Sequence, residues 1–138
     1  MTRVVVDTNV LVSALLKERG AEAAVLDLLV AGKLYWCISD ALLTEYREVL
    51  CRPKFAKIPR FQIEDLLTNA AAAYHFNPSM TASYSVHGPD NRFLECAEEA
   101  AAAFLITGNK RHFPAQWKGT KILNARELLN ILSNQPSG

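Results

Sequence analysis

The chain has 138 residues, half of them hydrophobic, and its 15 Lys and Arg residues against 14 Asp and Glu residues give a formal net charge of +1. This length predicts a single domain, residues 1–138 with an ordered core from about 3 to 132, that buries a hydrophobic core without disulfides. A net charge so close to zero gives no argument for or against binding to a nucleic acid or a membrane. Only the distribution of the charges along the chain can indicate such a partner.

The cysteines, Cys37, Cys51 and Cys96, are odd in number and far apart, without a paired spacing. Such cysteines favour a reducing interior. No apolar run approaches the roughly 20 residues of a membrane span. We therefore expect a soluble cytoplasmic protein with no membrane segment.

Short apolar runs alternate with longer segments of helical period in the first part of the chain. Residues 3–6 predict a strand, 9–16 and 21–31 two helices, 34–38 a strand, and 40–50 a helix capped by Ser39 or Asp40.

The second part continues the alternation after a basic connecting loop at residues 52–60. The predicted elements are a helix at 62–73, a short strand at 74–76, an irregular stretch at 80–88, a helix at 89–102 opened by Pro89, strands at 104–107 and 121–123, and a closing helix at 125–132 capped by Asn124. Alternating strands and helices predict an α/β fold, in which helices cover a parallel sheet.

Asp7 places a carboxylate directly after the apolar run at residues 3–6 and ahead of the next helix. Strands that are apolar on both faces belong to parallel sheets covered by helices, and such sheets bind ligands beyond the carboxyl ends of their strands. Asp7 is therefore a candidate for chemistry. The alternative interpretation is that Asp7 only caps the following helix.

Helical periodicity divides the acids of residues 89–102 into two groups. Asp90 shares one face of a 3.6-residue period with Phe93, Ala97 and Ala100, so we expect it to point with the core. The alternative for Asp90 is a first-turn acid that satisfies N–H groups of the helix. The acids on the opposite face, which we expect to be solvated, are Glu95, Glu98 and Glu99.

Two further polar sites have a simple structural alternative. Glu45 lies at the edge of the apolar stripe of its helix, beside Leu42 and Val49, where an ordinary surface position also explains it. Thr107 and Asn109 end a buried strand and could hold water or a metal-bound ligand, but a turn built from Gly and Asn explains them as well.

Asp7, Asp90 and the pair Thr107 and Asn109 are each predicted, by separate local arguments, to lie at one edge of the sheet. Neighbouring carboxylates raise each other's pKa unless a cation neutralises them. Oxygen ligands suit a hard cation, Mg²⁺ or Mn²⁺, and the sequence has no His and Cys cluster of zinc type. We therefore expect a divalent metal site able to act on a phosphate ester.

Four segments in order carry a resemblance to a known family. They are Val4-Val5-Val6-Asp7-Thr8-Asn9-Val10, Glu45 in a helix, Pro89-Asp90-Asn91-Arg92-Phe93-Leu94-Glu95-Cys96-Ala97, and Leu105-Ile106-Thr107-Gly108-Asn109. Together they resemble the PIN-domain nucleases, especially the stand-alone bacterial and archaeal proteins grouped with VapC-type toxins of toxin-antitoxin pairs. The match runs from about residue 3 to residue 132.

The resemblance implies a three-layer α/β/α sandwich with a central parallel sheet, and an endonuclease that hydrolyses RNA phosphodiesters with Mg²⁺ or Mn²⁺. Asn109 matches a fourth metal position, which can act through water. The residues that match the catalytic acids and metal ligands are Asp7, Glu45 and Asp90. The residues that match supporting positions are Thr8, Asn9 and Thr107. The family further implies a homodimer and a small antitoxin protein encoded nearby.

Two departures from the family leave the number of metal ions open. Many relatives carry Asp where this chain has Asn109, and many carry further acids where it has His87, Gly88 and Pro89. The alternative is therefore a catalytically weak or inactive PIN-like module that binds RNA or serves as a scaffold. A phosphatase of the haloacid-dehalogenase type would need a second Asp at the position of Asn9.

Basic residues form two clusters that could bind RNA phosphates. The first, directly after Asn109, is Lys110, Arg111 and His112. The second, in the loop at residues 52–60, includes Arg52, Lys54 and Lys57. A solvated run of charge is the alternative for the loop.

Overall fold

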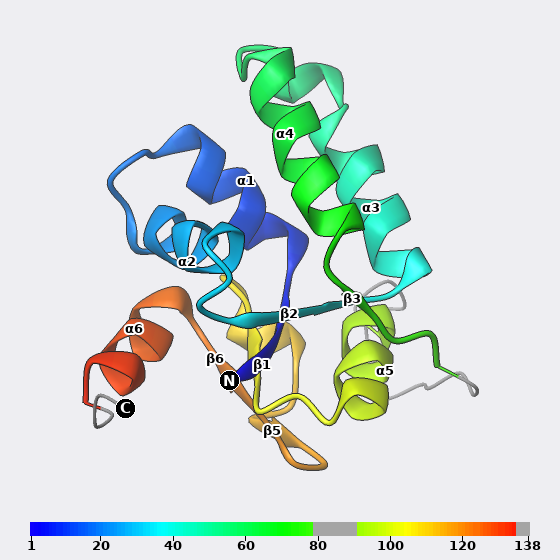
Figure 1. Cartoon of the computed structure of the whole chain (residues 1–138), viewed down its shortest axis with the longest axis vertical. Coiled ribbons are helices and arrows are strands. Elements are labelled where there is room, and N and C mark those ends of the chain that lie inside the picture. The colour runs from blue at the N-terminus through cyan, green and yellow to red at the C-terminus, as the bar shows by residue number, and fades with distance from the viewer. Residues whose placement is uncertain (79–90, 135–138) are drawn as a thin grey trace.

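A six-stranded sheet forms the central layer of the computed structural model, which describes residues 1–78 and 91–134 (Figure 1). The strands are β1 (Arg3–Val6), β2 (Tyr35–Ile38), β3 (Tyr74–His75), β4 (Phe104–Ile106), β5 (Gln116–Trp117) and β6 (Thr120–Leu123). The α-helices are α1 (Thr8–Leu16), α2 (Ala21–Val30), α3 (Asp40–Leu50), α4 (Arg60–Ala71), α5 (Asn91–Ala100) and α6 (Ala125–Ser133). The described residues also include the short 3-10 helices η1 (Pro53–Phe55) and η3 (Lys110–His112).

The strands lie in the order β3-β2-β1-β4-β6-β5. Within the described ranges every pairing is parallel except that of β5 with β6. Val6 of β1 is in register with Ile106 of β4, and the amide of Asp7 donates to the carbonyl oxygen of Ile106 at 2.8 Å. The next residues along the two strands, Asp7 and Thr107, therefore leave the sheet side by side.

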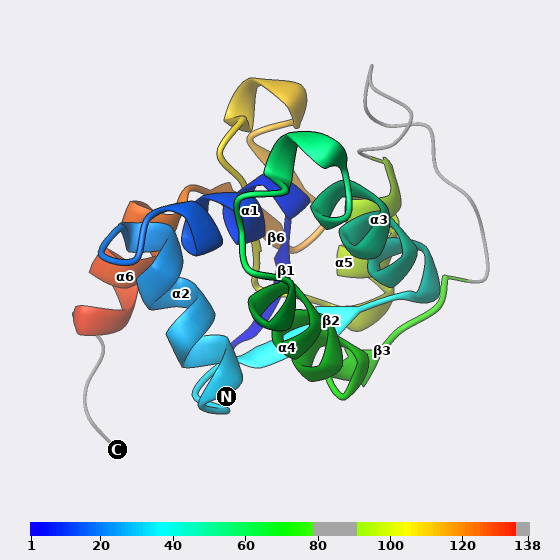
Figure 2. The same ribbon diagram turned by 90° about the horizontal axis from the view of Figure 1, so that it is seen from above.

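Helices cover both faces of the sheet because its central strand is apolar on both faces. Val4, Val5 and Val6 of β1 have no exposed surface. Helix α5 packs against β1, β2 and β4 on one side, and α1, α2 and α6 gather on the other (Figures 1 and 2). The arrangement confirms the three-layer α/β/α fold expected from the sequence.

Helices α3 and α4 pack side by side as a pair that stands out from the sheet (Figure 1). Ser39 caps α3, since its hydroxyl accepts a hydrogen bond from the amide of Leu42 at 3.2 Å.

No helix of residues 1–78 and 91–134 is long and apolar enough to cross a membrane.

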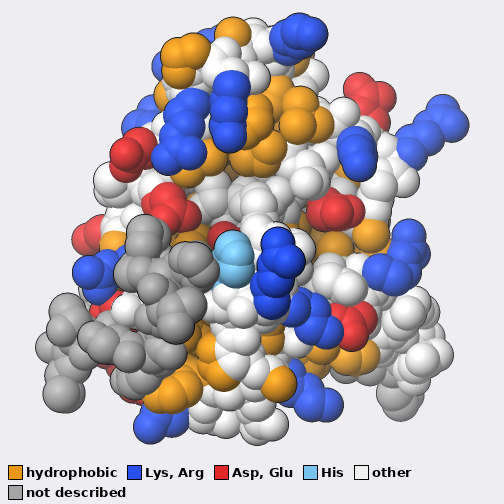
Figure 3. Space-filling view, turned by 180° about the vertical axis from the view of Figure 1, so that it is seen from behind, with side chains coloured by type: hydrophobic (Ala, Val, Ile, Leu, Met, Phe, Trp, Pro, Cys, Tyr) orange, Lys and Arg blue, Asp and Glu red, His pale blue; other side chains and the backbone are white. Residues whose placement is uncertain are grey.

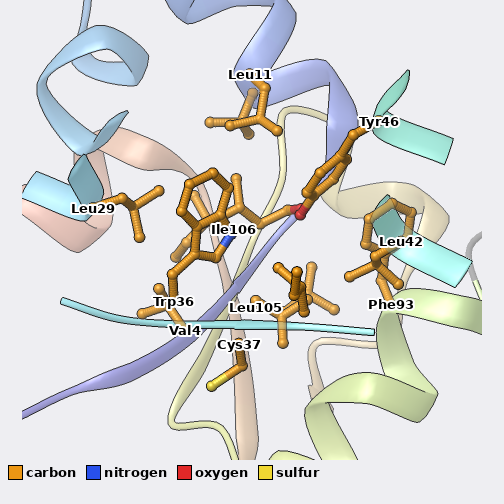
Figure 4. Packing of buried hydrophobic residues seen from close by; sticks show 14 of the residues in the cluster. Val4, Leu11, Leu29, Trp36, Cys37, Leu42, Tyr46, Phe93, Leu105 and Ile106 are labelled. Carbon is orange, nitrogen blue, oxygen red and sulfur yellow. The ribbon is translucent and has the colours of Figure 1, made fainter. Parts of the chain in front are cut away.

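Tyr46 anchors α3 to the sheet from inside the core (Figure 4). Its phenol is fully buried and donates a hydrogen bond of 2.5 Å to the carbonyl oxygen of Val6, the last residue of β1. Its ring lies 6.3 Å from that of Trp36 on β2, centroid to centroid. A buried phenol needs such an acceptor. The bond fixes α3 beside the carboxyl end of β1.

Most predicted elements are found within a residue or two of their expected bounds. Asn124 caps α6 as predicted, in a capping box with Glu127 whose two hydrogen bonds measure 2.8 and 2.9 Å. The sequence prediction missed β5 and the short helix η1 inside the basic loop. Pro89 and the segment 80–88, predicted to be irregular, lie outside the described residues.

Candidate active site

The chain changes direction across the sheet between β1 and β4. From β1 it proceeds to β2 and β3 on one side, then returns through α5 to β4 on the other side of β1. In open parallel sheets the carboxyl edge at such a reversal forms a crevice where ligands bind. Asp7 and Thr107, which follow β1 and β4, lie at this point.

Asp7 is held in a buried position at this edge, with 7 % of its surface exposed. It occupies the N-cap position of α1, but its side chain makes no capping hydrogen bond within the described part of the chain. One carboxylate oxygen, Oδ2, instead accepts a hydrogen bond of 2.7 Å from the hydroxyl of Thr107. The N-terminus of α1 still favours a negative charge here.

Glu45 approaches the same edge from α3, where it is half-buried. Its Oε2 accepts a hydrogen bond from the hydroxyl of Thr8, which is buried. The sequence placed Thr8 among the residues that support Asp7, and the structure shows its hydroxyl on Glu45. Since Thr8 directly follows Asp7 in the chain, this bond brings the second acid beside the first.

The phenol of Tyr46 lies within electrostatic reach of both acids. Burial, first of all, raises the pKa of Tyr46 well above its ordinary value, and the negative charges of Asp7 and Glu45 raise it further. Both carboxylates therefore act on one buried group at the end of β1.

A second set of hydrogen bonds ties the end of β4 to the start of α1. The hydroxyl of Thr107, which is fully buried, accepts a bond of 3.0 Å from the amide of Asn109. The side-chain oxygen of Asn9 accepts one of 3.1 Å from the amide of Gly108. A Cβ at Gly108 would lie 3.4 Å from that same oxygen, so the glycine permits the close approach. Asn109 itself is half-buried.

The oxygen donors at this edge fit a hard divalent cation. Asp7 and Glu45 supply carboxylates, and Asn109, whose backbone amide donates to Thr107 in the loop after β4, has a side chain of the neutral oxygen type that such a cation also accepts. Among residues 1–78 and 91–134, no group of three or more His, Cys, Asp and Glu side chains is close enough to hold an ion. Asp90, the third acid expected from the sequence, lies outside the described residues.

Glu95 corrects the sequence prediction for α5. We expected it on a solvated face with Glu98 and Glu99, and those two are exposed, but Glu95 has only 6 % of its surface exposed. It forms an ion pair with Arg92, three residues earlier. The sequence did contain a signal for this ion pair, since Arg92 and Glu95 are three residues apart and such residues meet on the surface of a helix.

A groove of about 520 Å³ runs along α3 beside Glu45. It lies between α3 and the start of α5, which are in contact. The residues that line it are Asp40, Ala41, Thr44, Glu45, Glu48, Val49, Arg52 and Arg92. Of the six basic-cluster residues considered from the sequence, Arg52 is the one that lines this groove.

The other basic residues take varied positions. Lys110 is engaged by Glu127, whose carboxylate oxygens lie 2.9 and 3.1 Å from its ammonium nitrogen. Lys54 lies over the ring of Phe55, 5.1 Å from its centroid, while Arg111 and Lys57 are exposed. His112 is half-buried in η3. On the face in Figure 3, a histidine lies near the centre with Lys and Arg side chains directly to its right, and Asp and Glu side chains are scattered among further Lys and Arg side chains over the same face.

Comparison with known proteins agrees with this geometry. The PIN-domain family matches residues 3–111. The chain belongs to the PIN-domain family. An uncharacterized protein of Methanocaldococcus jannaschii is 32 % identical to it over 111 residues, which cover 78 % of this chain and 71 % of that protein. PIN domains are in general nucleases that use divalent metal ions, and the matched range contains Asp7, Glu45 and Asn109.

Proposed function

We propose that this PIN-domain protein is a ribonuclease that cleaves RNA phosphodiesters with Mg²⁺ or Mn²⁺. The observation that supports it most is the placement of Asp7 and Glu45 at one edge of the sheet, each accepting a hydrogen bond from a threonine hydroxyl. In this proposal Asp7, Glu45 and Asp90 hold the cation, and Asn109 reaches it directly or through water.

The protein's own residues orient the reacting groups. Thr107 and Thr8 fix the carboxylates of Asp7 and Glu45, so that little reorganisation is needed when charge develops. When bound, the cation supplies the positive charge that a phosphodiester needs as water attacks it. Water adds to phosphorus, the bond from phosphorus to the 3′ oxygen breaks, and the proton ends on that oxygen. The products are a 5′ phosphate and a 3′ hydroxyl.

The test is cleavage of a labelled single-stranded RNA by purified protein, first with chelator and then with Mn²⁺ or Mg²⁺ restored. Asp7→Asn and Glu45→Gln are each expected to lower the rate by about a hundredfold or more. Asp27→Asn, which changes an exposed acid of α2, is the matched control. Full metal-dependent cleavage by either site variant would contradict the assignment. RNA binding without cleavage by the wild type would favour an inactive, RNA-binding module instead.

We further propose that the protein is the toxin of a toxin-antitoxin pair, a cytoplasmic homodimer neutralised by a small protein encoded nearby. Its three free cysteines suit a reducing compartment. An apolar hollow of about 170 Å³ between α1, α2 and α4 supports a protein partner, because Val30 and Phe61 at its rim are 49 % and 72 % exposed.

Expression tests the toxin proposal separately from the nuclease proposal. The wild type is expected to arrest growth, Asp7→Asn to be harmless, and co-expression of the neighbouring reading frame to restore growth. Light scattering of the purified protein reports its oligomeric state. Growth arrest that Asp7→Asn leaves intact would show that any toxicity is unrelated to the site.

A further inference from the structure

The ion pair with Glu95 holds the guanidinium of Arg92, a residue that lines the groove together with Glu45. The side chain of Glu95 is 5 % exposed, and that of Arg92 is 47 % exposed. A carboxylate so deeply buried is stable only with a partner that compensates its charge. The pair therefore fixes one edge of the guanidinium against α5 and leaves the remainder of the side chain at the surface.

The exposed part of Arg92 faces the groove, since Arg92 lines it together with Glu45 from the opposite helix. A guanidinium has five N–H donors in a rigid plane, and a single contact with Glu95 uses a minority of them. The plane suits the two oxygens of a phosphate. Arg52, which follows the C-terminal end of α3, lines the same groove, so two arginines and Glu45 share its lining.

Because acidic side chains also line the groove, a polyanion can bind there only where cationic side chains offset their charge. Asp40, Glu45 and Glu48 all line it from α3 and repel phosphates. Arginines within the same groove offset that repulsion locally. By contrast Lys110, adjacent to Asn109 in the chain, is held by Glu127.

We propose that Arg92 binds a backbone phosphate of single-stranded RNA lying in the groove between α3 and α5, with Arg52 contacting a further phosphate and Glu95 acting as the positioning residue for Arg92. This rests on the proposed ribonuclease function for its substrate class. Both arginines line one groove, so they are placed to contact phosphates of the same strand.

Binding measured apart from cleavage tests the proposal. A fluorescent single-stranded RNA is titrated with protein carrying Asp7→Asn, at several salt concentrations. Adding Arg92→Gln is expected to weaken binding about tenfold and to reduce the slope of log affinity against log salt by about 0.7, the effect of one phosphate contact on a single strand. Arg92→Lys is expected to keep the slope and to recover part of the affinity. Arg126→Gln, which removes an exposed cation of α6 that does not line the groove, is the control and should change neither as much.

Glu95→Gln separates positioning from net charge. Removing a negative charge should strengthen RNA binding if charge is all that matters, whereas loss of the anchor for Arg92 should weaken it. We expect weaker binding, about threefold or more, with KM affected more than kcat in the cleaving protein. Tighter binding by Glu95→Gln, or an unchanged affinity and slope in Arg92→Gln protein that melts like the wild type, would overturn the proposal. Should Arg92→Gln fail to fold, Arg92→Lys and Arg52→Gln carry the same test. A wild type that binds RNA but does not cleave it would defeat the ribonuclease proposal and leave this binding test valid.

Discussion

The hydroxyl of Thr107 donates a 2.7 Å hydrogen bond to the carboxylate of Asp7 across a sequence separation of 100 residues. The bond joins the carboxyl ends of β1 and β4, and the same hydroxyl accepts the amide of Asn109. One buried oxygen therefore orients an acid and closes the loop that carries Asn109.

Thr107→Val removes this oxygen while keeping the volume of the side chain. We expect the free energy of unfolding to fall by about 1 to 3 kcal/mol, the cost of leaving buried polar groups without their partner. We also expect Mn²⁺ affinity to fall about tenfold, since a ligand loses the group that orients it. Urea unfolding and calorimetric titration with Mn²⁺ measure the two effects.

Thr120→Val is the matched control for that prediction. Thr120 is equally buried and donates a 2.7 Å bond to the carbonyl oxygen of Ala102, away from Asp7. It should lower stability by a similar amount and leave Mn²⁺ affinity unchanged. Equal metal affinities in both variants and the wild type would show that Thr107 has only a structural role.

Local sequence patterns were sufficient to place Asp7 and Thr107 at one edge of the sheet. Each follows a short apolar run, and parallel strands end at a common edge, so no knowledge of the register was needed. The partner of Thr8 was not predictable in this way. Its bond to Glu45 depends on how α3 packs beside β1, which the buried phenol of Tyr46 fixes through a long-range contact.

The prediction that Glu95 is solvated was wrong because helical periodicity shows which face of a helix is buried, but not how wide the buried arc is. Helix α5 contacts β1, β2 and β4, and also α3, so its buried arc is wider than one apolar stripe. Strand β5 was missed for a different reason, since two residues are too few to show any period.

The carboxylate of Glu127 predicts a pH dependence of stability. The backbone amide of Asn124, and then the ammonium of Lys110, hold its pKa below the ordinary value of 4.5. Because the folded pKa is lowered, Glu127 stabilises the fold above that value and loses its effect as the pH falls through the lowered pKa.

The measurement compares the melting temperatures of the wild type and Glu127→Gln from about pH 7 to about pH 3. The wild type should be more stable at neutral pH, and the two curves should converge in acid. Lys110→Gln removes the second cause and keeps the first, so it should show an intermediate loss at neutral pH. A difference that stays constant over the whole range would contradict the role given to this carboxylate.

The cysteines are expected to differ sharply in their reactivity. Burial raises the pKa of Cys37 to about 11 and that of Cys96 to about 12, while Cys51 is exposed. The thiolate is the reactive form, so the two buried thiols should react slowly in folded protein. A thiol reagent at neutral pH should label Cys51 rapidly and the other two only on unfolding. Cys51→Ser should abolish the fast phase, and a fast phase that survives this change would contradict the burial of Cys37 and Cys96.

Asn109→Asp tests whether the missing fourth acid limits metal binding. Asn109 is half-buried, and its amide is tied to the hydroxyl that orients Asp7, so a new carboxylate would lie within the same loop cluster. Without metal, like charges should repel and lower the melting temperature. With Mn²⁺, the added charge should tighten binding on the order of tenfold and raise the melting temperature above that of the wild type.

Asn130→Asp on the exposed side of α6 is the control, because it adds the same charge away from Asp7. If Asn109→Asp lowers stability with and without Mn²⁺ alike, Asn109 does not lie within reach of the cation, and the site is confined to the acids that precede β4.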